Sequence, residues 1–195
     1  MFTGIIEAIG QIKQVEQRDK GVRLTIASDR LDFSDVGVGD SIAANGVCLT
    51  VTTLSGNAYT VDVSQESLNC TVGLGQTGEV NLEKAMRLSD RLGGHLVSGH
   101  VDGVGEVVKF EPVGESHLLQ IRALKELARY IAAKGSITIN GVSLTVNAID
   151  DQVFSINLIP HTVEVTTLKH LKPGAKVNLE VDMLARYVDR LLHPE

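Results

Sequence analysis

The sequence predicts an all-β protein made of two similar, tandem, closed antiparallel barrels of about six short strands each. One observation is the alternation of apolar and polar residues along many short segments. Turn residues separate these segments about every 8–12 residues. The other is an internal repeat, because residues 41–51 (SIAANGVCLTV) return as residues 136–146 (SITINGVSLTV) at an offset of 95 residues. A repeat of this length is a whole small domain and not a solenoid unit.

The strands of the first half follow from this alternation, and Gly or Asn-Gly pairs mark the turns between them. We expect strands at residues 24–26, 49–52, 59–63 and 80–83. A weak helical pattern lies around residues 31–36.

The second half repeats this scheme. We expect strands at residues 104–108, 118–121, 136–139, 143–146, 154–158 and 177–181. A short helix is predicted over residues 124–131, because Leu124, Leu127 and Ile131 lie at i, i+3 and i+7.

Two segments lie outside the repeat. Residues 88–94 join the halves, and Leu184, Val188 and Leu191 form one stripe of a terminal helix. The helix either lies on its own barrel or assembles subunits. We favour assembly, because the first half has no counterpart of this helix. The predicted organisation is a first barrel over residues 1–92, a second over 93–183 and an assembly helix over 184–195.

Composition excludes several classes of protein. The chain has 195 residues, 43% of them hydrophobic, and a net charge of −6 without any basic run. This argues against binding to nucleic acid or to an anionic membrane surface. No apolar stretch approaches the roughly 20 residues of a membrane span, and the N-terminus lacks a signal-peptide pattern. We therefore expect a cytoplasmic protein in which Cys48 and Cys70 are free thiols.

Two motifs are better explained by structural roles than by cofactor or metal binding. Residues 73–78 read GLGQTG, but a strand pattern follows them, whereas a dinucleotide-binding loop needs a helix there. His95 and His100 lack a cysteine pair or a carboxylate at ligand spacing, so no metal site is expected. His95 reads as a packed histidine at the joint of the halves. His100 takes the position of Ile5 in the first copy, which marks an asymmetry.

The most informative difference between the copies is Cys48 against Ser143. Each precedes a threonine by two residues, Thr50 and Thr145, so each pair shares one face of a strand. Cys48 alone would read as a small buried hydrophobe, but the matched pairs indicate two versions of one ligand site. The nucleophile elbow of a serine hydrolase is missing. Asp182 corresponds in the repeat to an alanine of the first copy, which is a further difference between the copies.

Residues 62–67 (DVSQES) pair in the repeat with residues 157–162 (NLIPHT). Their polar groups either hold the heteroatoms of a ligand or form caps and turns.

Four blocks carry a resemblance to a known family. They are residues 1–7 (MFTGIIE), 45–51 (NGVCLTV), 93–100 (GGHLVSGH) and 158–162 (LIPHT). In this order, and with the internal repeat, the chain resembles the riboflavin synthase family of the alpha-chain type over essentially its whole length. The resemblance implies six-stranded Greek-key barrels and a homotrimer held by the C-terminal helices.

The resemblance also implies a reaction. Two molecules of 6,7-dimethyl-8-ribityllumazine exchange a four-carbon unit and give riboflavin and 5-amino-6-(D-ribitylamino)uracil, without a cofactor or metal. Each active site lies between the first barrel of one subunit and the second barrel of its neighbour. Whether a lumazine synthase shell surrounds the trimer stays open. A non-catalytic branch of lumazine-binding fluorescent proteins is the alternative, and a barrel for an unrelated ligand is a third. The match at catalytic positions favours the enzyme.

The resemblance further assigns residues to the site. The implied catalytic residues are Cys48, His100, Ser143, Thr145 and Asp182. The implied first-barrel pocket contains Gly4, Ile5, Ile6, Ser41, Cys48, Leu49, Thr50, Asp62, Val63, Ser64, Gln65, Glu66 and Ser67. The implied second-barrel pocket contains Gly99, His100, Val101, Lys134, Ser143, Leu144, Thr145, Asn157, Leu158, Ile159, Pro160, His161 and Thr162. Histidine titrates near neutral pH, so His100 suits proton transfer. Ser143 and Asp182 are expected to form a hydrogen-bonded pair, and Cys48 is either a nucleophile or a ring contact.

Overall fold

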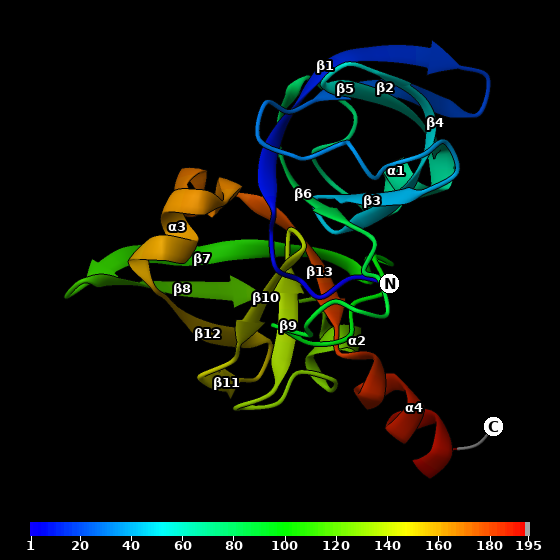
Figure 1. The fold of residues 1–195 in the computed structure, drawn as a ribbon. Coiled ribbons are helices and arrows are strands. Elements are labelled where there is room, and N and C mark those ends of the chain that lie inside the picture. Colours follow the sequence, from blue (N-terminus) through cyan, green and yellow to red (C-terminus); the bar gives the residue numbers. More distant parts are fainter. Residues whose placement is uncertain (194–195) are drawn as a thin grey trace.

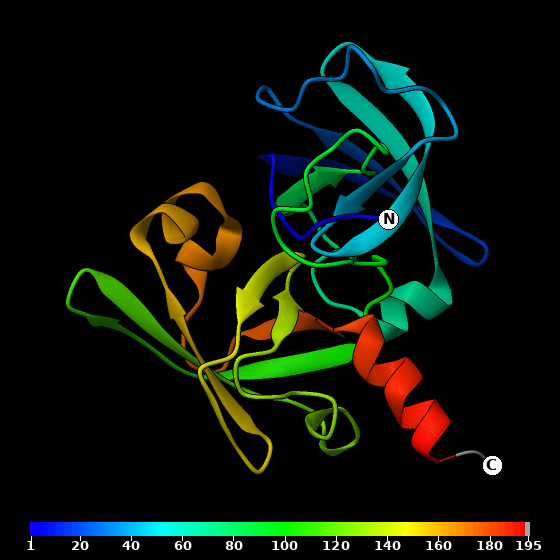
Figure 2. The same ribbon diagram turned by 60° about the horizontal axis from the view of Figure 1, so that its bottom comes forward.

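The computed structural model describes residues 1–193 and contains one antiparallel sheet in each half of the chain (Figures 1 and 2). The first half contains β1 (Ala8–Arg18), β2 (Gly21–Ala27), β3 (Ser41–Ala44), β4 (Val47–Ser55), β5 (Ala58–Ser64), α1 (Gln65–Cys70) and β6 (Gly78–Lys84). These strands form a closed barrel in the order β1-β2-β5-β4-β3-β6. Residues 194 and 195, the end of the predicted segment 184–195, lie outside the described residues.

The second half repeats this plan with one interruption. It contains β7 (Gly103–Val113), β8 (Ser116–Arg122), α2 (Lys125–Ala128), β9 (Ser136–Ile139), β10 (Val142–Thr145), β11 (Ala148–Asp150), β12 (Val153–Leu158), α3 (Pro160–Val165), the 3-10 helix η1 (Thr167–His170), β13 (Lys176–Val181) and α4 (Met183–Leu192). The sheet order is β10-β9-β13-β7-β8-β12-β11. Its two edge strands are consecutive in the chain and correspond to the single strand β4. Between them the Asn147 N–H donates to the Ser155 carbonyl at 2.8 Å, so the sheet curls toward closure. The predicted all-β fold of two similar barrels is confirmed.

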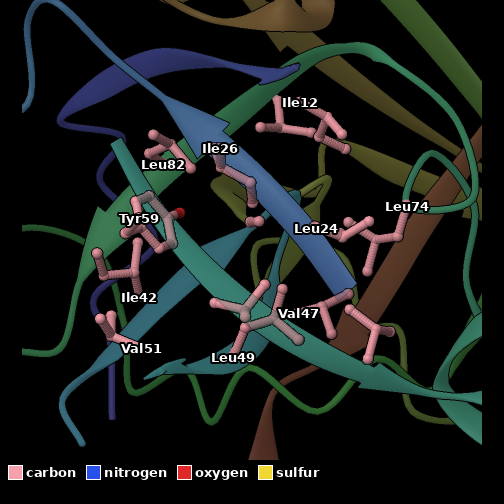
Figure 3. Close-up of a cluster of buried hydrophobic side chains, with 14 of the residues drawn as sticks. Ile12, Leu24, Ile26, Ile42, Val47, Leu49, Val51, Tyr59, Leu74 and Leu82 are labelled. Carbon is pink, nitrogen blue, oxygen red and sulfur yellow. The ribbon is translucent and has the colours of Figure 1, made fainter. Parts of the chain in front are cut away.

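The alternation of residues places the apolar side chains inside each barrel. In β5, Tyr59, Val61 and Val63 are buried in the first core, whereas Asp62 between the valines is exposed. Figure 3 shows Tyr59 among the apolar side chains that fill this barrel. Burying such side chains stabilises a barrel by about 1.5–3 kcal/mol each. The polar residues between them therefore lie on the outer face, where a ligand can reach them.

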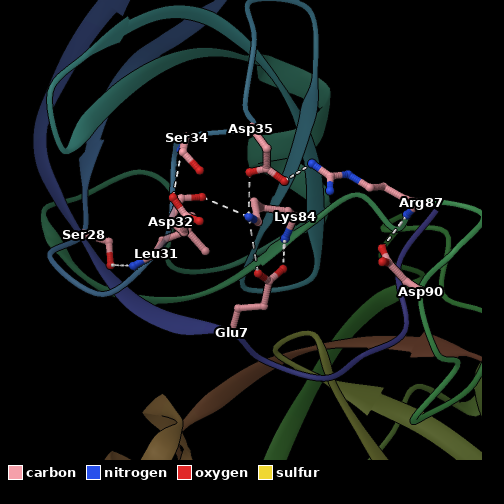
Figure 4. Close-up of polar contacts among 9 residues, drawn as sticks. All are labelled: Glu7, Ser28, Leu31, Asp32, Ser34, Asp35, Lys84, Arg87 and Asp90. Atoms are coloured by element: carbon pink, nitrogen blue, oxygen red, sulfur yellow. Dashed lines mark hydrogen bonds and ion pairs between the residues drawn. The ribbon is translucent and has the colours of Figure 1, made fainter.

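The predicted strands are confirmed, whereas β1, β3 and β11 were not predicted. The predicted helix over 124–131 is only the four-residue α2, and no helix is present over 31–36. In that segment side chains bond to the backbone and form turns instead: Leu31 N–H donates to the Ser28 hydroxyl at 3.2 Å, and Ser34 N–H donates to Asp32 at 2.9 Å (Figure 4).

The helices α1 and α3 lie in the two segments for which the sequence left two interpretations, groups that hold a ligand or caps and turns. They begin at residues 65 and 160, at the offset of the repeat. The Ser64 hydroxyl caps α1 by accepting from the Ser67 N–H, and Pro160 opens α3. Helices of one or two turns carry no periodic pattern that a sequence could reveal.

The terminal helix α4 extends away from the second half (Figures 1 and 2). Its charged face holds it to the body, because Arg186 pairs with Asp102 and Asp189 pairs with Arg129. Except for the partly buried Met183, its large apolar side chains are exposed, namely Leu184, Tyr187, Val188, Leu191 and Leu192. The alternative in which the apolar stripe packs on its own barrel is therefore wrong.

Further predictions concern the thiols and the glycine-rich motif. Both cysteines are free thiols, as predicted. The motif at residues 73–78 is a loop that leads into β6, which confirms that it is not a dinucleotide-binding turn. Within residues 1–193, every helix is too short or too polar to span a membrane.

Candidate functional site

The two halves meet at the tips of two Asn-Gly hairpins. Asn45 and Asn140 both have φ of +48°, and Gly46 and Gly141 have φ of +81° and +82°. A Cβ on either glycine would lie 2.7 Å from the backbone nitrogen of the other. Glycine is therefore required by both its left-handed conformation and this close approach. The hairpins face each other about a local pseudo-twofold axis.

Four buried asparagines hold this junction. Within each half, a backbone N–H donates to a hairpin side chain, from Asn81 to Asn45 Oδ1 at 2.9 Å and from Asn178 to Asn140 Oδ1 at 2.8 Å. Across the junction, Asn81 Nδ2 donates to the Asn140 carbonyl at 2.9 Å. Asn178 Nδ2 donates to the Asn45 carbonyl at 3.0 Å. This reciprocal network fixes the placement of one half against the other.

The segments that precede the two barrels cross to the opposite half. We call residues 1–6 and 96–101 the crossing segments. The Gly4 carbonyl accepts from the Ser143 N–H at 2.7 Å, and the Gly99 carbonyl accepts from the Cys48 N–H at 2.8 Å. Within one chain, Gly4 therefore lies against the second half and Gly99 against the first, the reverse of the halves to which the resemblance assigned them. Both copies carry the segment at the same offset, so the repeat alone does not tell which half each one serves.

Two buried carboxylates anchor the crossing segments. Glu83 accepts hydrogen bonds from Thr3 N–H at 2.6 Å, from the Thr3 hydroxyl at 2.6 Å and from Gly4 N–H at 2.9 Å. Glu180 accepts the corresponding three bonds from the other segment, beginning at Ser98. Burial raises the pKa of both carboxyls, and these donors act against the rise. The carboxylates are structural anchors that bring Gly4 and its counterpart to the opposite barrel.

The first predicted group lies on the outer face of the first barrel. Cys48 and Thr50 flank the buried Leu49 in β4, so they share one strand face as predicted, and this is the outer face of the barrel. Ser41 pairs with Thr50 across β3 and β4. The backbone of Gly99 covers Cys48 so closely that a Cβ there would lie 2.7 Å from Cys48 Cβ. Hydroxyl and thiol groups thus line a face that ends at a crossing segment.

The two outer faces differ in charge. Arg23 donates two hydrogen bonds of 2.7 Å to the Asp62 carboxylate, and these bonds hold the pKa of Asp62 below its usual value. A hollow of about 800 Å³ lies between the β1–β2 turn and Ser64, with Arg23 and Asp62 in its lining. At the corresponding positions of the second half, Asn157 pairs with Leu118. The first face therefore carries a charged pair where the second is neutral.

The second group centres on Ser143. Its hydroxyl lies 2.7 Å from His95 Nδ1, and His95 is only 8% exposed. Burial lowers the pKa of His95, and the charge of Asp182 partly opposes this. The predicted pair of Ser143 with Asp182 is not formed, because Asp182 Oδ1 instead accepts from the Leu184 N–H at 3.0 Å and caps α4. The sequence pointed to Ser143 but not to its partner.

The other predicted residues divide between the same two faces. Thr145 is exposed and pairs with Ser136 across β9 and β10. His100 is exposed in its crossing segment, and Lys134 lies in the loop before β9 with its N–H bonded to the Val146 carbonyl. The residues that begin or precede α1 and α3 are Ser64, Gln65, Glu66, Ser67, Ile159, Pro160, His161 and Thr162. Three predicted residues, Leu49, Val63 and Leu158, bury their side chains in the cores and can offer a ligand only backbone groups.

Comparison with known proteins agrees with this duplicated site. Residues 3–85 and 98–182 match the family model described as the lumazine binding domain. A riboflavin synthase of Photobacterium phosphoreum is 48% identical over 98% of this chain and 89% of its own. The crystal structures of LumP complexed with 6,7-dimethyl-8-(1'-D-ribityl) lumazine and with riboflavin have TM-scores of 0.82 and 0.83, with 28% and 30% identity. Each alignment covers 93% of this chain and 99% of LumP.

Proposed function

The chain belongs to the lumazine-binding family that includes the riboflavin synthases, and from this we propose that it is a riboflavin synthase. It converts two molecules of 6,7-dimethyl-8-ribityllumazine into riboflavin and 5-amino-6-(D-ribitylamino)uracil. The observation that carries the proposal is the pair of matched but unequal outer faces, one at Cys48 and one at Ser143. A reaction between two identical molecules needs two similar cradles, and their different fates need the cradles to differ.

Positioning supplies much of the catalysis in this proposal. Two reactants held in a reactive geometry gain about 7–11 kcal/mol relative to reactants that meet by diffusion. One lumazine then loses a proton from its C7 methyl group, and the other takes a nucleophile at its own C7. Cys48 and Ser143 mark the two cradles, and the exposed His100 is a proton carrier between them. The reaction needs no cofactor or metal.

Assembly completes the site in this proposal. The exposed apolar stripe of α4 supports a homotrimer in which the helices contact one another. The outer face of the first barrel in one subunit then meets the second-barrel face of its neighbour, and the two lumazines lie between them. The chain works as a first barrel over residues 1–92, a second over 93–183 and an assembly helix from 184. We place the trimer in the cytoplasm and leave its association with a lumazine synthase shell open.

The decisive experiment combines turnover with subunit mixing. The purified protein is incubated with 6,7-dimethyl-8-ribityllumazine, and we expect one riboflavin for every two lumazines consumed. The variants Cys48→Ala and Ser143→Ala should each be nearly inactive, and refolding them together should restore part of the activity. Ser55→Ala, which removes an exposed hydroxyl at the end of β4, should match the wild type. Active wild-type protein whose mixed variants stay inactive would contradict a site built from two subunits.

A second candidate function is binding without turnover, which the similarity to LumP favours. In that case the protein retains the lumazine or riboflavin with a stable change in fluorescence, and no new riboflavin forms. Fluorescence titration beside the turnover assay separates the two functions.

A further inference from the structure

The hydroxyl of Ser143 lies in a confined setting. A Cβ added to Gly4 would lie 2.6 Å from Ser143 Cβ, and one added to Gly94 would lie 2.9 Å from Ser143 Oγ. Both neighbours must therefore be glycines, and they leave the hydroxyl beside the imidazole of His95 at 2.7 Å. The backbone N–H of His95 donates to the Thr3 carbonyl at 3.1 Å, which ties the ring to a crossing segment.

We propose that His95 is a positioning residue that orients the Ser143 hydroxyl and receives its proton during turnover. The inference deepens the proposed function and rests on it. In the neutral Nε2–H tautomer, Nδ1 is a free acceptor toward which the serine hydroxyl points. A proton leaving the C7 methyl group of a bound lumazine passes to Ser143 Oγ as the hydroxyl proton passes to Nδ1. The lumazine becomes an anion and the imidazole an imidazolium, and the proton returns along the same path.

The surroundings of His95 suit this task. The ring is almost fully buried, which favours its neutral, proton-accepting form at neutral pH. Among the described residues, Asp182 is the charged group that acts on this ring, and its negative charge stabilises an imidazolium once it forms. The carboxylate of Asp182 thus assists through the histidine and not through Ser143 directly.

The repeat makes this arrangement one-sided. Cys48 is the counterpart of Ser143, and within residues 1–193 the Ser143 hydroxyl is bonded to a histidine whereas the Cys48 thiol is not. The backbone contacts are matched in the two halves, since Gly4 serves Ser143 as Gly99 serves Cys48. A histidine acceptor therefore belongs to the second-half face only. This gives the two lumazine cradles different proton affinities.

The test separates positioning from folding by exchanging His95 for two residues. Asn can place an amide near the position of Nδ1 but cannot take up a proton, whereas Ala removes the contact. We expect His95→Asn to bind riboflavin like the wild type, to lose about 100-fold in kcat with little change in KM, and to lose the acid limb of the pH–rate profile. His95→Ala should lose at least as much. His117→Asn, a histidine stacked on Phe110 in the second sheet, serves as the matched control and should be unchanged.

The double variant His95→Asn/Ser143→Ala decides whether the histidine acts through the serine. We expect it to be no slower than Ser143→Ala alone, because the two residues form one unit. Losses that multiply, or an unchanged pH profile in His95→Asn, would overturn the proposal.

A measurement without turnover distinguishes the failure of this inference from the failure of the proposed function. Imidazole nitrogen NMR should give a hydrogen-bonded Nδ1 resonance for His95 that shifts in Ser143→Ala and that reports a pKa below the ordinary histidine value near 6.5. If the wild type makes no riboflavin, the proposed function fails, and so does the catalytic role of His95, whatever the resonance shows. If turnover occurs and the resonance is the same in Ser143→Ala, the pairing itself is refuted.

Discussion

Gly46 of the first half packs backbone to backbone against Gly141 of the second, so that neither position has room for a side chain. The contact lies on the local pseudo-twofold axis, between the two Asn-Gly hairpins. It explains why the repeat keeps the same dipeptide in both copies. It also means that a single methyl group should disturb the junction of the halves and not only its own turn.

We expect Gly46→Ala to lower the free energy of unfolding by about 2–5 kcal/mol. The added Cβ would meet Gly141 N at 2.7 Å, and overpacking adds to the cost of a left-handed alanine. Gly56→Ala is the matched control, because its φ is +60° with no atom within 4 Å, and it should cost about 1–2 kcal/mol. Urea unfolding measures both. Equal losses would show that the contact between the hairpins carries no energy.

Replacing Asn81 tests the asparagine network. Asn81→Ala leaves the buried Asn140 carbonyl and the Thr167 N–H without their partners, and each unsatisfied group costs about 1–3 kcal/mol. We therefore predict a loss of about 2–5 kcal/mol in chemical denaturation. Asn178→Ala should behave similarly, because it makes the reciprocal bonds. The exposed Asn57→Ala should stay within about 0.5 kcal/mol of wild type, and a similar loss there would argue against a special role for the junction.

The lowered pKa of His95 predicts how stability changes with pH. Below the ordinary histidine value near 6.5, the unfolded chain binds a proton that the folded ring resists, so stability falls with pH from there toward the folded pKa. His95→Asn should remove this contribution. The difference in unfolding free energy between wild type and variant should be constant above about pH 7 and should change between pH 6.5 and the folded pKa. A difference that is flat across this range would contradict a depressed pKa.

The apolar stripe of α4 predicts the behaviour of the assembly. Leu191 is 80% exposed in the single chain, and we expect Leu191→Glu to convert a trimer into monomers with little change in far-UV circular dichroism. Leu88→Glu is the control, because Leu88 is likewise an exposed leucine but lies in the segment that joins the halves. Light scattering after size exclusion gives the masses. A Leu191→Glu protein that stays trimeric would place the contact elsewhere.

Sequence reasoning succeeded where residue alternation decides the outcome. The strands around Tyr59 and Phe154 were predictable because every second side chain is buried in a barrel core. The shared strand face of Cys48 and Thr50 followed from the same periodicity. The short helices α1 and α3 were not predicted, because capping by Ser64 and the rigidity of Pro160 are local effects that leave no periodic pattern in the sequence.

The site was predictable only in part, for a physical reason. A duplicated sequence shows which residues correspond, but not whether a segment serves its own barrel or the other one. The exchange that brings Gly4 to Ser143 depends on the fold of both halves together. The comparison of the copies singled out Ser143 through its counterpart Cys48 but gave no signal for His95. Only the folded structure places the His95 ring 2.7 Å from the Ser143 hydroxyl.

The crossing segments also determine how the molecule would come apart. Phe2 and Val97 exchange two backbone hydrogen bonds where these segments run side by side, at 2.8 and 3.0 Å. Each half therefore binds a segment that belongs to the other half. A protease that cuts the exposed stretch around Leu88 would break the covalent chain without releasing either fragment. The nicked protein would stay whole in solution until denaturant opened both halves.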